Sequence, residues 1–565
     1  MPIDLMTAEG EALLASGKTP WTAYPRPQMK RDSYVNLNGQ WDFTVTPGGN
    51  LPRQYDKKIL VPFCPESQLS GLKFHPKDGD FLFYRRFFSL PADFNRGRVL
   101  LHIGAVDQAA DIYVNQKHCK DHTGGYEAFT VDITDALAEE NELVIRARDD
   151  LRDPVMPYGK QTLKRGGMWY TPVSGIWQTV WLESVPENYI QKLSIENRGY
   201  RVIITTEPAL DGKITVRDLG EFSLTEGRAE IAPENPRLWC PEDPYLYEFT
   251  VETGEDRVGS YFAIRSLEIR EVDGCRRLCL NEKPYFFHGL LDQGYWPDGL
   301  FTPAAPECYE KDILAMKSLG FNMLRKHIKV EPEQFYYDCD RLGIVVFQDM
   351  VNNGKYHFFR DTALPTVGIQ KLPDKGLNRN KNTRGEFLRQ MEMTVNQLKN
   401  HPCICYWTIF NEGWGQFDSD TVYEQFRKLD DTRFIDTTSG WFRRHETDVD
   451  SRHVYFRPVK LKAGKKPLVL SEFGGYACKC QGHIFNPDQS FGYSTYENPR
   501  ELSDAVEKLY TKEILPAFYS GLCAAVYTQV SDVEDEINGV LTYDRKVTKL
   551  DPERMRSIAK KFQWE

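Results

Sequence analysis

Two glutamates, Glu412 and Glu472, each directly follow an apolar run of the kind that forms a strand. Glu412 comes after residues 406–411, and Glu472 comes after residues 468–471. Cleavage of a glycosidic bond requires two carboxyl groups, because one protonates the leaving oxygen while the other attacks the anomeric carbon or activates water. Asn411, beside Glu412, could donate a hydrogen bond to a neighbouring sugar hydroxyl. A single glutamate after a strand is more often a surface residue or a charge at a helix N-terminus, so the hypothesis depends on the pair.

The chain beyond residue 269 alternates strand-like and helical segments. Eight runs fit strands, at residues 284–290, 321–325, 344–347, 403–410, 434–437, 454–456, 468–470 and 523–527. Helical patterns separate several of them, although none fills the stretch 438–453. The alternation predicts a (β/α)8 TIM barrel, in which functional side chains lie where strands end and the following loops begin. Glu412 and Glu472 occupy such positions.

The chain ahead of the barrel consists of short strands and turns without a strong helical period. Apolar or β-branched runs bounded by turn residues occur at 99–103, 111–114, 143–148, 201–205 and 247–251. They predict a β-sandwich over residues 1–185 and a small immunoglobulin-like β-sandwich over residues 186–268, followed by the barrel over residues 269–565. A length of 565 residues fits about three or four domains, so we expect a multidomain fold.

The composition excludes several functions. A formal net charge of −10 argues against a nucleic acid partner, which would require clustered lysine and arginine. The first six residues lack the basic and apolar segments of a signal peptide, and no run reaches the roughly 18 apolar residues of a membrane span. The 12 cysteines are scattered, and the one-residue spacings at 403–405 and 478–480 fit neither a zinc ribbon nor a redox pair. We therefore expect a cytoplasmic protein with reduced thiols and no membrane contact.

Motifs spread over nearly the whole chain resemble those of glycoside hydrolase family 2, which includes β-galactosidases, β-glucuronidases and β-mannosidases. Residues 104–107, 124–129 and 175–182 are similar to the sugar-binding jelly-roll domain of that family. Trp239, with residues 244–247, is similar to the end of its immunoglobulin-like domain. The resemblance implies that the first sandwich is a jelly roll.

The barrel motifs carry the chemistry that the resemblance implies. Asn411-Glu412 on an aromatic strand resembles the acid/base motif of the family, and residues 471–474, with the sequence Ser-Glu-Phe-Gly, resemble its nucleophile motif. The resemblance therefore implies that Glu412 is the acid/base, that Glu472 is the nucleophile, and that Asn411 binds the 2-hydroxyl of the sugar.

Further substrate contacts are implied on other strands. Asn322, Arg325 and His327 resemble the second-strand set of the family, in which the rigid guanidinium of the arginine orients the nucleophile. His327 lies two residues after Arg325, where the family usually has three, so a histidine satisfied within the core is an equal alternative. Tyr455 resembles a tyrosine that hydrogen-bonds the nucleophile, and a core aromatic is its alternative.

Departures from the family pattern bear on the sugar. Gly167 stands where bacterial β-galactosidases carry an aspartate before a Met-Trp pair. Residues 536–538, with the sequence Glu-Ile-Asn, stand where β-glucuronidases carry an Asn-x-Lys pair that grips the uronate. Because Glu536 would repel a uronic acid, the sequence disfavours a glucuronidase.

Three aromatic or acidic residues are additional candidates for the sugar pocket. Trp296 and Asp298 lie in the loop after the first barrel strand, and Tyr527 ends the last strand, where many family members carry tryptophan. Each could instead have a purely structural role, and a structural loop is the more common explanation for the first two.

These observations predict an exo-acting, retaining glycoside hydrolase that removes a terminal β-linked neutral sugar by double displacement. Such a mechanism requires the two carboxyl groups to lie about 5–5.5 Å apart. A β-galactoside is the first choice of substrate, with a β-glucuronidase, β-mannosidase or arabinosidase activity as the alternative within enzymes. A carbohydrate-binding protein without catalysis is the alternative outside them. We expect no cofactor and no metal site, a carbohydrate as the partner, and an oligomeric state that the sequence leaves open, with a homodimer as one option.

Overall fold

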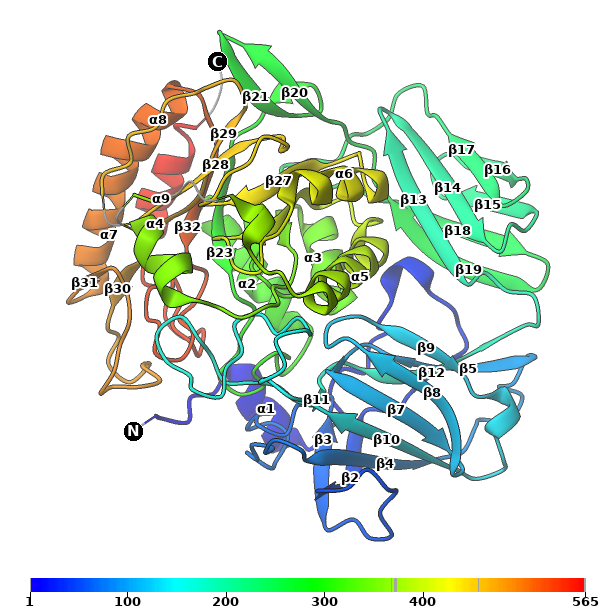
Figure 1. The fold of residues 1–565 in the computed structure, drawn as a ribbon. Coiled ribbons are helices and arrows are strands. Elements are labelled where there is room, and N and C mark those ends of the chain that lie inside the picture. Colours follow the sequence, from blue (N-terminus) through cyan, green and yellow to red (C-terminus); the bar gives the residue numbers. More distant parts are fainter. Residues whose placement is uncertain (1, 367, 370–372, 456, 563–565) are drawn as a thin grey trace.

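The computed structural model of the protein describes residues 2–366, 368–369, 373–455 and 457–562. Three hydrophobic cores organise these residues, one in each of two β-sandwiches and a larger one centred on a barrel. Figure 1 shows the first sandwich, in blue and cyan, below the barrel, and the second sandwich beside the barrel. The predicted multidomain fold of two sandwiches and a TIM barrel is confirmed, while the exact domain boundaries stay predictions.

The first sandwich packs a six-stranded sheet against a four-stranded sheet, both antiparallel. Alternate residues of its strands are buried, because successive side chains of a strand point to opposite faces. The larger sheet has the order β3 (Lys57–Val61), β2 (Gly39–Thr46), β4 (Phe81–Phe88), β10 (Asn141–Arg148), β7 (Ala109–Val114) and β8 (Lys117–Thr123). The smaller has the order β1 (Tyr34–Asn36), β12 (Val180–Val185), β5 (Arg98–Ile103) and β9 (Phe129–Asp132). Two short strands, β6 (Val106–Asp107) and β11 (Gly175–Ile176), pair separately.

The second sandwich packs a three-stranded sheet against a four-stranded sheet. Their strand orders are β13 (Lys192–Arg198), β14 (Arg201–Glu207), β17 (Arg228–Ile231), and β16 (Gly220–Leu224), β15 (Gly212–Val216), β18 (Tyr247–Thr253), β19 (Asp256–Phe262). Arg265, directly after this sandwich, donates to the carbonyls of Pro402 (2.6 Å) and Ile404 (2.7 Å) in the barrel. A small sheet of β20 (Leu267–Val272), β21 (Cys275–Leu280) and β22 (Lys283–Pro284) then leads into the barrel.

The barrel is a nearly closed sheet of eight parallel strands. Its order is β27 (Phe434–Ser439), β26 (Ile404–Asn411), β25 (Val345–Asp349), β24 (Met323–Lys326), β23 (Phe287–Asp292), β32 (Leu522–Thr528), β29 (Leu468–Gly474) and β28 (Asp450–Val454). Its two end strands, β27 and β28, are linked by a hydrogen bond from Ser451 Oγ to Asp436 Oδ1 of 2.9 Å. Every residue of β25, β26 and β29 is buried, as expected for parallel strands covered on both faces.

Helices cover the outside of the barrel. They are α2 (Glu307–Ser318), α3 (Glu333–Leu342), α4 (Leu364–Thr366), α5 (Lys381–Leu398), α6 (Ser419–Leu429), α7 (Pro499–Leu509), α8 (Leu515–Tyr519) and α9 (Pro552–Ala559), with a π-helical segment, Tyr510–Ile514, between α7 and α8. Phe335, Tyr336 and Cys339 form the buried face of α3, which ends at Gly343. The φ of Gly343 is +72°, a left-handed conformation that glycine adopts without strain.

The sixth barrel strand lies earlier in the chain than the sequence predicts. The prediction was residues 454–456, whereas β28 spans Asp450–Val454, and Phe456 lies outside the described residues. The side chains of β28 include Ser451 and His453, which point to polar partners inside the barrel, so the strand has no apolar run to reveal it. No helix precedes it between residues 440 and 449, all of which are described, as the sequence pattern predicts.

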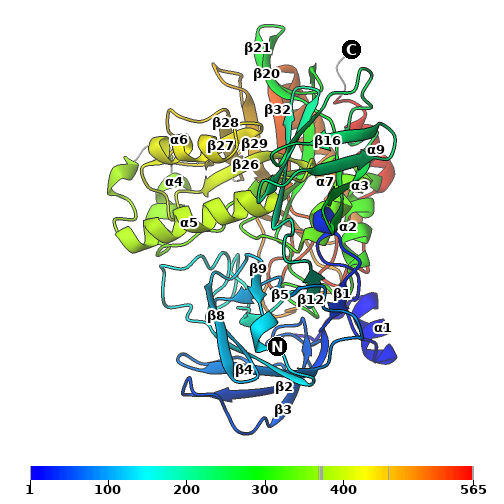
Figure 2. The same ribbon diagram turned by 90° about the vertical axis from the view of Figure 1, so that its right-hand side faces the viewer.

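The first sandwich meets the loops of the barrel at several places (Figure 2). Near the start of β9, the backbone N–H of Ala128 donates to Gln397 of α5 over 3.0 Å. Farther along the chain, the N–H of Tyr158 donates to the carbonyl of Asn352 (3.1 Å), and its hydroxyl donates to that of Gly354 (2.8 Å). The long connection between β10 and β11 therefore lies against the loop that follows β25.

The sequence predicts reduced thiols and no membrane-spanning helix, and the structure bears on both points. All twelve cysteines are free thiols. Within the described residues, no helix has both the length and the apolar character that crossing a bilayer would demand.

Candidate active site

Glu412 and Glu472 lie at the carboxyl ends of two barrel strands. Glu412 directly follows β26, and Glu472 lies within β29. The backbone φ of Glu412 is +53°, a left-handed conformation that is uncommon outside glycine and occurs where the surrounding structure holds it. Its N–H donates to the carbonyl of Ser439 in β27 over 2.9 Å, which helps to hold this turn. The Glu412 side chain is 20% exposed, whereas that of Glu472 is 6% exposed.

The two carboxyl groups face a common space together with His453 of β28. One oxygen of Glu412, one oxygen of Glu472 and one ring nitrogen of His453 all lie within 4.8 Å of one another. Nδ1 of His453 is 2.8 Å from Glu412 Oε1 and 3.5 Å from Glu472 Oε2. Nε2 of the same ring is 3.1 Å from the hydroxyl of Ser439. The imidazole thus joins the two glutamates.

Arg325, in β24, holds three site residues at once and is buried. Its guanidinium donates to Glu472 Oε1 over 3.1 Å, to Asp349 Oδ1 over 3.0 Å and to Asn411 Oδ1 over 2.9 Å. Because Oδ1 of Asn411 accepts from Arg325, its Nδ2 is the atom left to donate to a ligand. The other carboxylate oxygen of Asp349 binds Nδ1 of His327 over 2.7 Å.

Tyr455 completes the surroundings of Glu472. Its hydroxyl is 2.6 Å from Glu472 Oε2 and 2.9 Å from the hydroxyl of Thr528 in β32. Its ring stacks on that of Tyr493, with centroids 4.1 Å apart. Glu472 therefore has a separate hydrogen-bond partner on each oxygen, Arg325 on one and Tyr455 on the other.

The charge state of Glu472 follows from these contacts. Burial alone raises the pKa of the Glu472 carboxyl, but the positive charges of His453 and Arg325, with the Tyr455 hydrogen bond, outweigh it and lower the pKa to about 2. Burial also raises the pKa of Asp349, and the charge of Arg325 outweighs it, so that pKa is lowered as well. Glu472 is consequently a carboxylate throughout the neutral pH range.

Side chains from the first sandwich reach the same end of the barrel. The ring of Trp169 lies 5.2 Å from that of Trp414, which follows the catalytic candidate Glu412 by two residues, and 4.9 Å from that of Tyr356. The ammonium of Lys160 lies 5.7 Å from the centre of the Trp169 ring. The mouth of the barrel is thus lined by two domains.

Asn322 lies at the wrong end of the barrel for a substrate contact. It precedes β24, and its amide accepts from the N–H of His288 (2.8 Å) and donates to the carbonyl of Phe286 (3.0 Å). These backbone groups belong to the amino ends of the strands, opposite Glu412 and Glu472. The structure does not bring Asn322 together with the two glutamates, because its amide satisfies backbone groups where β23 and β24 begin.

Trp296 and Asp298 have structural roles in the loop after β23. Asp298 is buried, and its Oδ2 accepts from the N–H (2.9 Å) and the hydroxyl (2.5 Å) of Thr7, the residue that caps helix α1 (Ala8–Ser16). The guanidinium of Arg545 covers the Trp296 ring at 4.0 Å from its centre. Both side chains therefore contact other segments of the chain, and the structural role that the sequence offered as the alternative accounts for these contacts.

Tyr527 of β32 is also a core residue. Its ring packs edge-on against Phe473 at 5.6 Å and lies 6.5 Å from Tyr510 in the helical layer outside the barrel. A Cβ on Gly474 would lie 2.3 Å from the Tyr527 ring, so the two residues are in close contact. The side chain thus packs between strand and helix rather than in the sugar pocket that the sequence suggested.

Sequence reasoning missed His453 and Asp349. His453 lies in the strand that has no apolar run, so no pattern marks it. Asp349 is the last residue of β25, and the rule that functional residues follow barrel strands could have found it. Thr528, the last residue of β32, belongs to the same class of missed positions.

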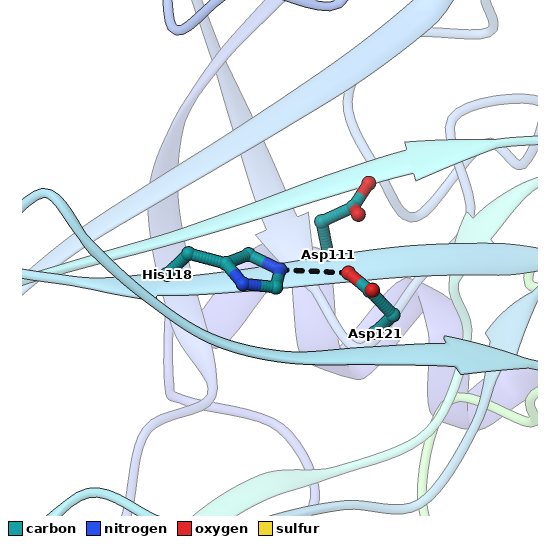
Figure 3. A group of neighbouring side chains, drawn as sticks. All are labelled: Asp111, His118 and Asp121. Atoms are coloured by element: carbon teal, nitrogen blue, oxygen red, sulfur yellow. Dashed lines mark hydrogen bonds and ion pairs between the residues drawn. The ribbon is translucent and has the colours of Figure 1, made fainter.

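Among the residues that the structure describes, two groups of side chains have the spacing of metal ligands, and each also has a cation against it. One is Glu412, His453 and Glu472, where the guanidinium of Arg325 binds Glu472. The other, on the exposed strands β7 and β8, contains Asp111, His118 and Asp121, with His118 bonded to Asp121 over 2.7 Å (Figure 3). Arg146 already pairs with Asp111 at 2.7 Å. We assign no metal to either group.

The fold and the site together define a protein with two β-sandwiches followed by a TIM barrel, which carries a pair of carboxyl groups at the carboxyl ends of its strands. Three models of one family match the chain in order. They are described as "Glycosyl hydrolase 2 galactose-binding domain-like" over residues 72–161, "Glycosyl hydrolases family 2" over residues 188–265 and "Glycosyl hydrolases family 2, TIM barrel domain" over residues 271–550. The chain belongs to glycosyl hydrolases family 2.

Individual relatives carry two different activities in their names. A β-glucuronidase of Bacteroides fragilis is 25% identical over 418 residues, which cover 67% of this chain and 56% of that protein. A β-galactosidase of Thermoanaerobacter pseudethanolicus is 27% identical over 440 residues, which cover 71% of this chain and 54% of that protein. The chain thus spans about half the length of the curated relatives it matches.

Solved structures share the whole architecture. A β-glucuronidase from an uncultured Clostridium sp. superposes with a TM-score of 0.73 at 19% identity, over 94% of this chain and 99% of that chain. A β-galacturonidase from Eisenbergiella tayi, bound to galacturonate, superposes with a TM-score of 0.67 at 18% identity, over 95% and 99% of the two chains. At these identities, the likeness establishes the fold alone.

Proposed function

We propose that the protein is a retaining β-glycosidase in which Glu472 is the nucleophile and Glu412 is the acid/base. The observation that carries the proposal is the ionised Glu472, fixed by Arg325 and Tyr455, with a carboxylate oxygen within 4.8 Å of one on Glu412. This separation favours retention, because inverting enzymes leave about 6.5–9.5 Å between the carboxyl groups for a water molecule. Membership of the family supports the same chemistry.

The proposed reaction has two displacements. In the first, Glu472 attacks the anomeric carbon, the bond from that carbon to the glycosidic oxygen breaks, and Glu412 donates its proton to the departing oxygen. In the second, water attacks the same carbon, Glu412 takes the proton of the water, and the ester bond to Glu472 breaks. Asn411, held by Arg325, is positioned to donate to the 2-hydroxyl of the sugar. No cofactor enters either step.

The identity of the sugar is the finer part of the proposal. Among the relatives named above, uronidases outnumber galactosidases, which favours a β-uronoside over the neutral β-galactoside expected from the sequence. The β-galactoside stays a second candidate, because Thermoanaerobacter β-galactosidase is one of the matching relatives. We keep both classes in the test.

Hydrolysis of 4-nitrophenyl glycosides tests the function directly. The panel holds the β-glucuronide, β-galacturonide, β-galactoside, β-glucoside, β-mannoside and α-arabinoside, each given to wild type, Glu412→Gln and Glu472→Gln. We expect wild type to hydrolyse one class of glycoside in the panel. The turnover of that glycoside should fall at least about a thousandfold in Glu472→Gln. Proton NMR of the first-formed sugar then reports the anomer.

Two outcomes would overturn the proposal. Release of the inverted anomer would exclude double displacement, and full activity of Glu472→Gln would exclude Glu472 as the nucleophile. If wild type hydrolyses none of the glycosides but binds a free sugar saturably in calorimetry, the result would instead support a carbohydrate-binding protein without catalysis.

A further inference from the structure

Lys160 is carried to the mouth of the barrel by a segment of the first sandwich that the barrel holds firmly. The N–H groups of Tyr158 and Gly159 both donate to the carbonyl of Asn352, over 3.1 and 3.3 Å. Gly159 has a φ of +59°, and a Cβ there would lie 2.9 Å from the carbonyl oxygen of Ile328. The carbonyl of Lys160 itself accepts from the N–H of Tyr170 over 3.0 Å. The backbone on both sides of the lysine is therefore held by hydrogen bonds.

The ammonium of Lys160 has no carboxylate partner among the described residues. No ion pair within 4.0 Å and no side-chain hydrogen bond involves it, although the side chain is only partly exposed. The centre of the Trp169 ring lies 5.7 Å from the ammonium, and an aromatic face attracts a cation without neutralising it. A partly buried ammonium without a counter-ion is a favourable place for an anionic group to bind.

The charge of this ammonium is felt by two residues near the proposed site. The positive charge of Lys160 contributes to the pKa values of two residues, His327 and Glu536. His327 is bonded to Asp349, and Asp349 also binds Arg325, which contacts Glu472. Lys160 therefore acts electrostatically on residues of the site, and its neighbour Trp169 contacts Trp414, two residues after Glu412.

Glu536 is the acidic residue that led the sequence to disfavour a uronic acid, and its carboxyl group is already engaged. The hydroxyl of Tyr170 donates to Oε2, and Nδ2 of Asn538 donates to Oε1 over 2.9 Å. Burial raises the pKa of Glu536, and the charge of Glu472 acts in the same direction, so its negative charge is disfavoured. Its repulsion of an anionic sugar is correspondingly weakened.

We propose that Lys160 is a specificity-determining residue that binds the carboxylate of a uronic acid sugar, so that β-uronosides are the preferred substrates. The inference rests on the proposed β-glycosidase function and names its substrate class. A neutral hexoside offers a hydroxymethyl group in place of the carboxylate, and its bond to the ammonium lacks the opposite charge that makes such contacts strong. Lysine at this position is supplied by the first sandwich, whereas Glu472, Arg325 and Tyr455 come from the barrel.

Matched substrates that differ only at C6 test the inference. Wild type, Lys160→Met and Lys160→Arg are assayed on 4-nitrophenyl β-galacturonide against the β-galactoside, and on the β-glucuronide against the β-glucoside. Methionine keeps the apolar stem over Trp169 and removes the charge. The control is Lys164→Met, which removes an exposed lysine four residues along the same segment.

We expect wild type to prefer one of the two uronides over its neutral counterpart. Lys160→Met should lose about 10- to 100-fold in kcat/KM on that uronide and about twofold or less on the neutral sugar, with partial recovery in Lys160→Arg. Lys164→Met should match wild type on every substrate. Preference of wild type for a neutral sugar, or equal losses on both members of a pair, would overturn the role of Lys160 while leaving the glycosidase function intact.

Calorimetry separates this inference from failure of the proposed function. If wild type hydrolyses no glycoside, the glycosidase proposal fails, and binding of free D-glucuronate and D-galacturonate still decides the role of Lys160. Binding by wild type that is lost in Lys160→Met and kept in Lys164→Met would support it. Absent binding, or equal binding by wild type and Lys160→Met, would overturn it.

Discussion

Glu472 is buried, yet it remains charged, and the balance of its neighbours explains why. Removing a carboxylate from water is unfavourable, but Arg325 and His453 supply opposite charges at 3.1 and 3.5 Å. Arg325 is itself neutralised in part by Asp349, so the site is a chain of alternating charges rather than a single pair. Removing one member should therefore change the protonation of the next.

Replacement of His453 by asparagine should move the acid limb of activity to higher pH. The pKa of Glu472 is raised by burial but held at about 2 chiefly by the charge of His453, so loss of that charge lets the pKa rise. The nucleophile is then protonated, and activity lost, at a pH where wild type still works. The measurement is kcat/KM against pH on the best substrate of the panel. An acid limb unchanged from wild type would contradict the prediction, and His118→Asn, an exposed histidine, is the control.

Removal of the Tyr455 hydroxyl should slow catalysis with little effect on substrate binding. Tyr455→Phe leaves Glu472 Oε2 without its 2.6 Å partner, and we expect kcat to fall by about 10- to 100-fold. Tyr527→Phe, at a buried tyrosine of β32, should change kcat by about twofold or less. Steady-state kinetics of the two variants measures both effects. A larger loss of kcat in Tyr527→Phe than in Tyr455→Phe would contradict the prediction and favour Tyr527 as a sugar contact.

The sequence predicted much of this residue-level arrangement but not its histidine. Glu412, Glu472, Arg325 and Asn411 could be found because each stands in a recognisable motif at the end of a strand. His453 could not, because it lies on a strand whose side chains face polar groups inside the barrel. The structural role of Asp298 could not be predicted for a different reason. Its partner, Thr7, is 291 residues away, and nothing in the sequence connects them.

At the scale of elements, the loop after β23 is a docking site for helix α1. Asp298 accepts two hydrogen bonds from Thr7, whose hydroxyl in turn accepts from the N–H of Gly10 over 3.0 Å. A Cβ on Gly10 would lie 2.1 Å from Asp298 Oδ2, so glycine permits this close approach. The helix is thus capped and attached to the barrel by one buried carboxylate.

Asp298→Ala should destabilise the protein and leave its chemistry intact. The substitution leaves the buried N–H and hydroxyl of Thr7 without an acceptor, and we expect the free energy of unfolding to fall by about 1–3 kcal/mol. Urea unfolding measures the loss, and kcat on the best substrate should stay within about twofold of wild type. A large loss of kcat at unchanged stability would return Asp298 to the substrate site.

The strand pattern was the most predictable feature at this scale. Six of the eight barrel strands overlap the predicted runs by most of their length, and a seventh, β29, begins with its predicted run, because parallel strands covered on both faces are continuous apolar sequences. The exception, β28, shows the limit of that signal. Its position depends on hydrogen bonds with neighbouring strands, which a single sequence does not record.

At the scale of the whole molecule, several carboxyl groups are buried where the first sandwich meets the barrel. Burial raises the pKa of Glu66 to about 8, that of Glu127 to about 8 and that of Asp149 to about 7. In the unfolded chain these groups lose their protons near pH 4, but in the folded protein they keep them to higher pH. Unfolding between about pH 5 and pH 8 therefore releases protons, and stability falls as the pH rises.

Glu127→Gln should reduce that pH dependence. The amide stays neutral in both states, so the variant should gain stability relative to wild type at pH 8, on the order of 1–3 kcal/mol, and little at pH 5. Melting temperatures across this range measure the effect, and Glu140→Gln, an exposed residue of the same sandwich, is the control. Melting curves that shift in parallel with wild type at every pH would contradict the prediction.

The segment that brings Lys160 and Trp169 to the barrel also separates two kinds of evolutionary change. The proposed catalytic glutamates lie in the barrel, whereas the proposed sugar-selecting residue, Lys160, lies in a connection of the first sandwich. Substitutions in residues 158–169 can therefore alter which sugar is accepted without disturbing the strands that hold the glutamates. Related proteins that share this barrel could therefore acquire different substrate specificities through changes in this segment. Exchange of the first sandwich between such proteins would be a direct route to new specificity.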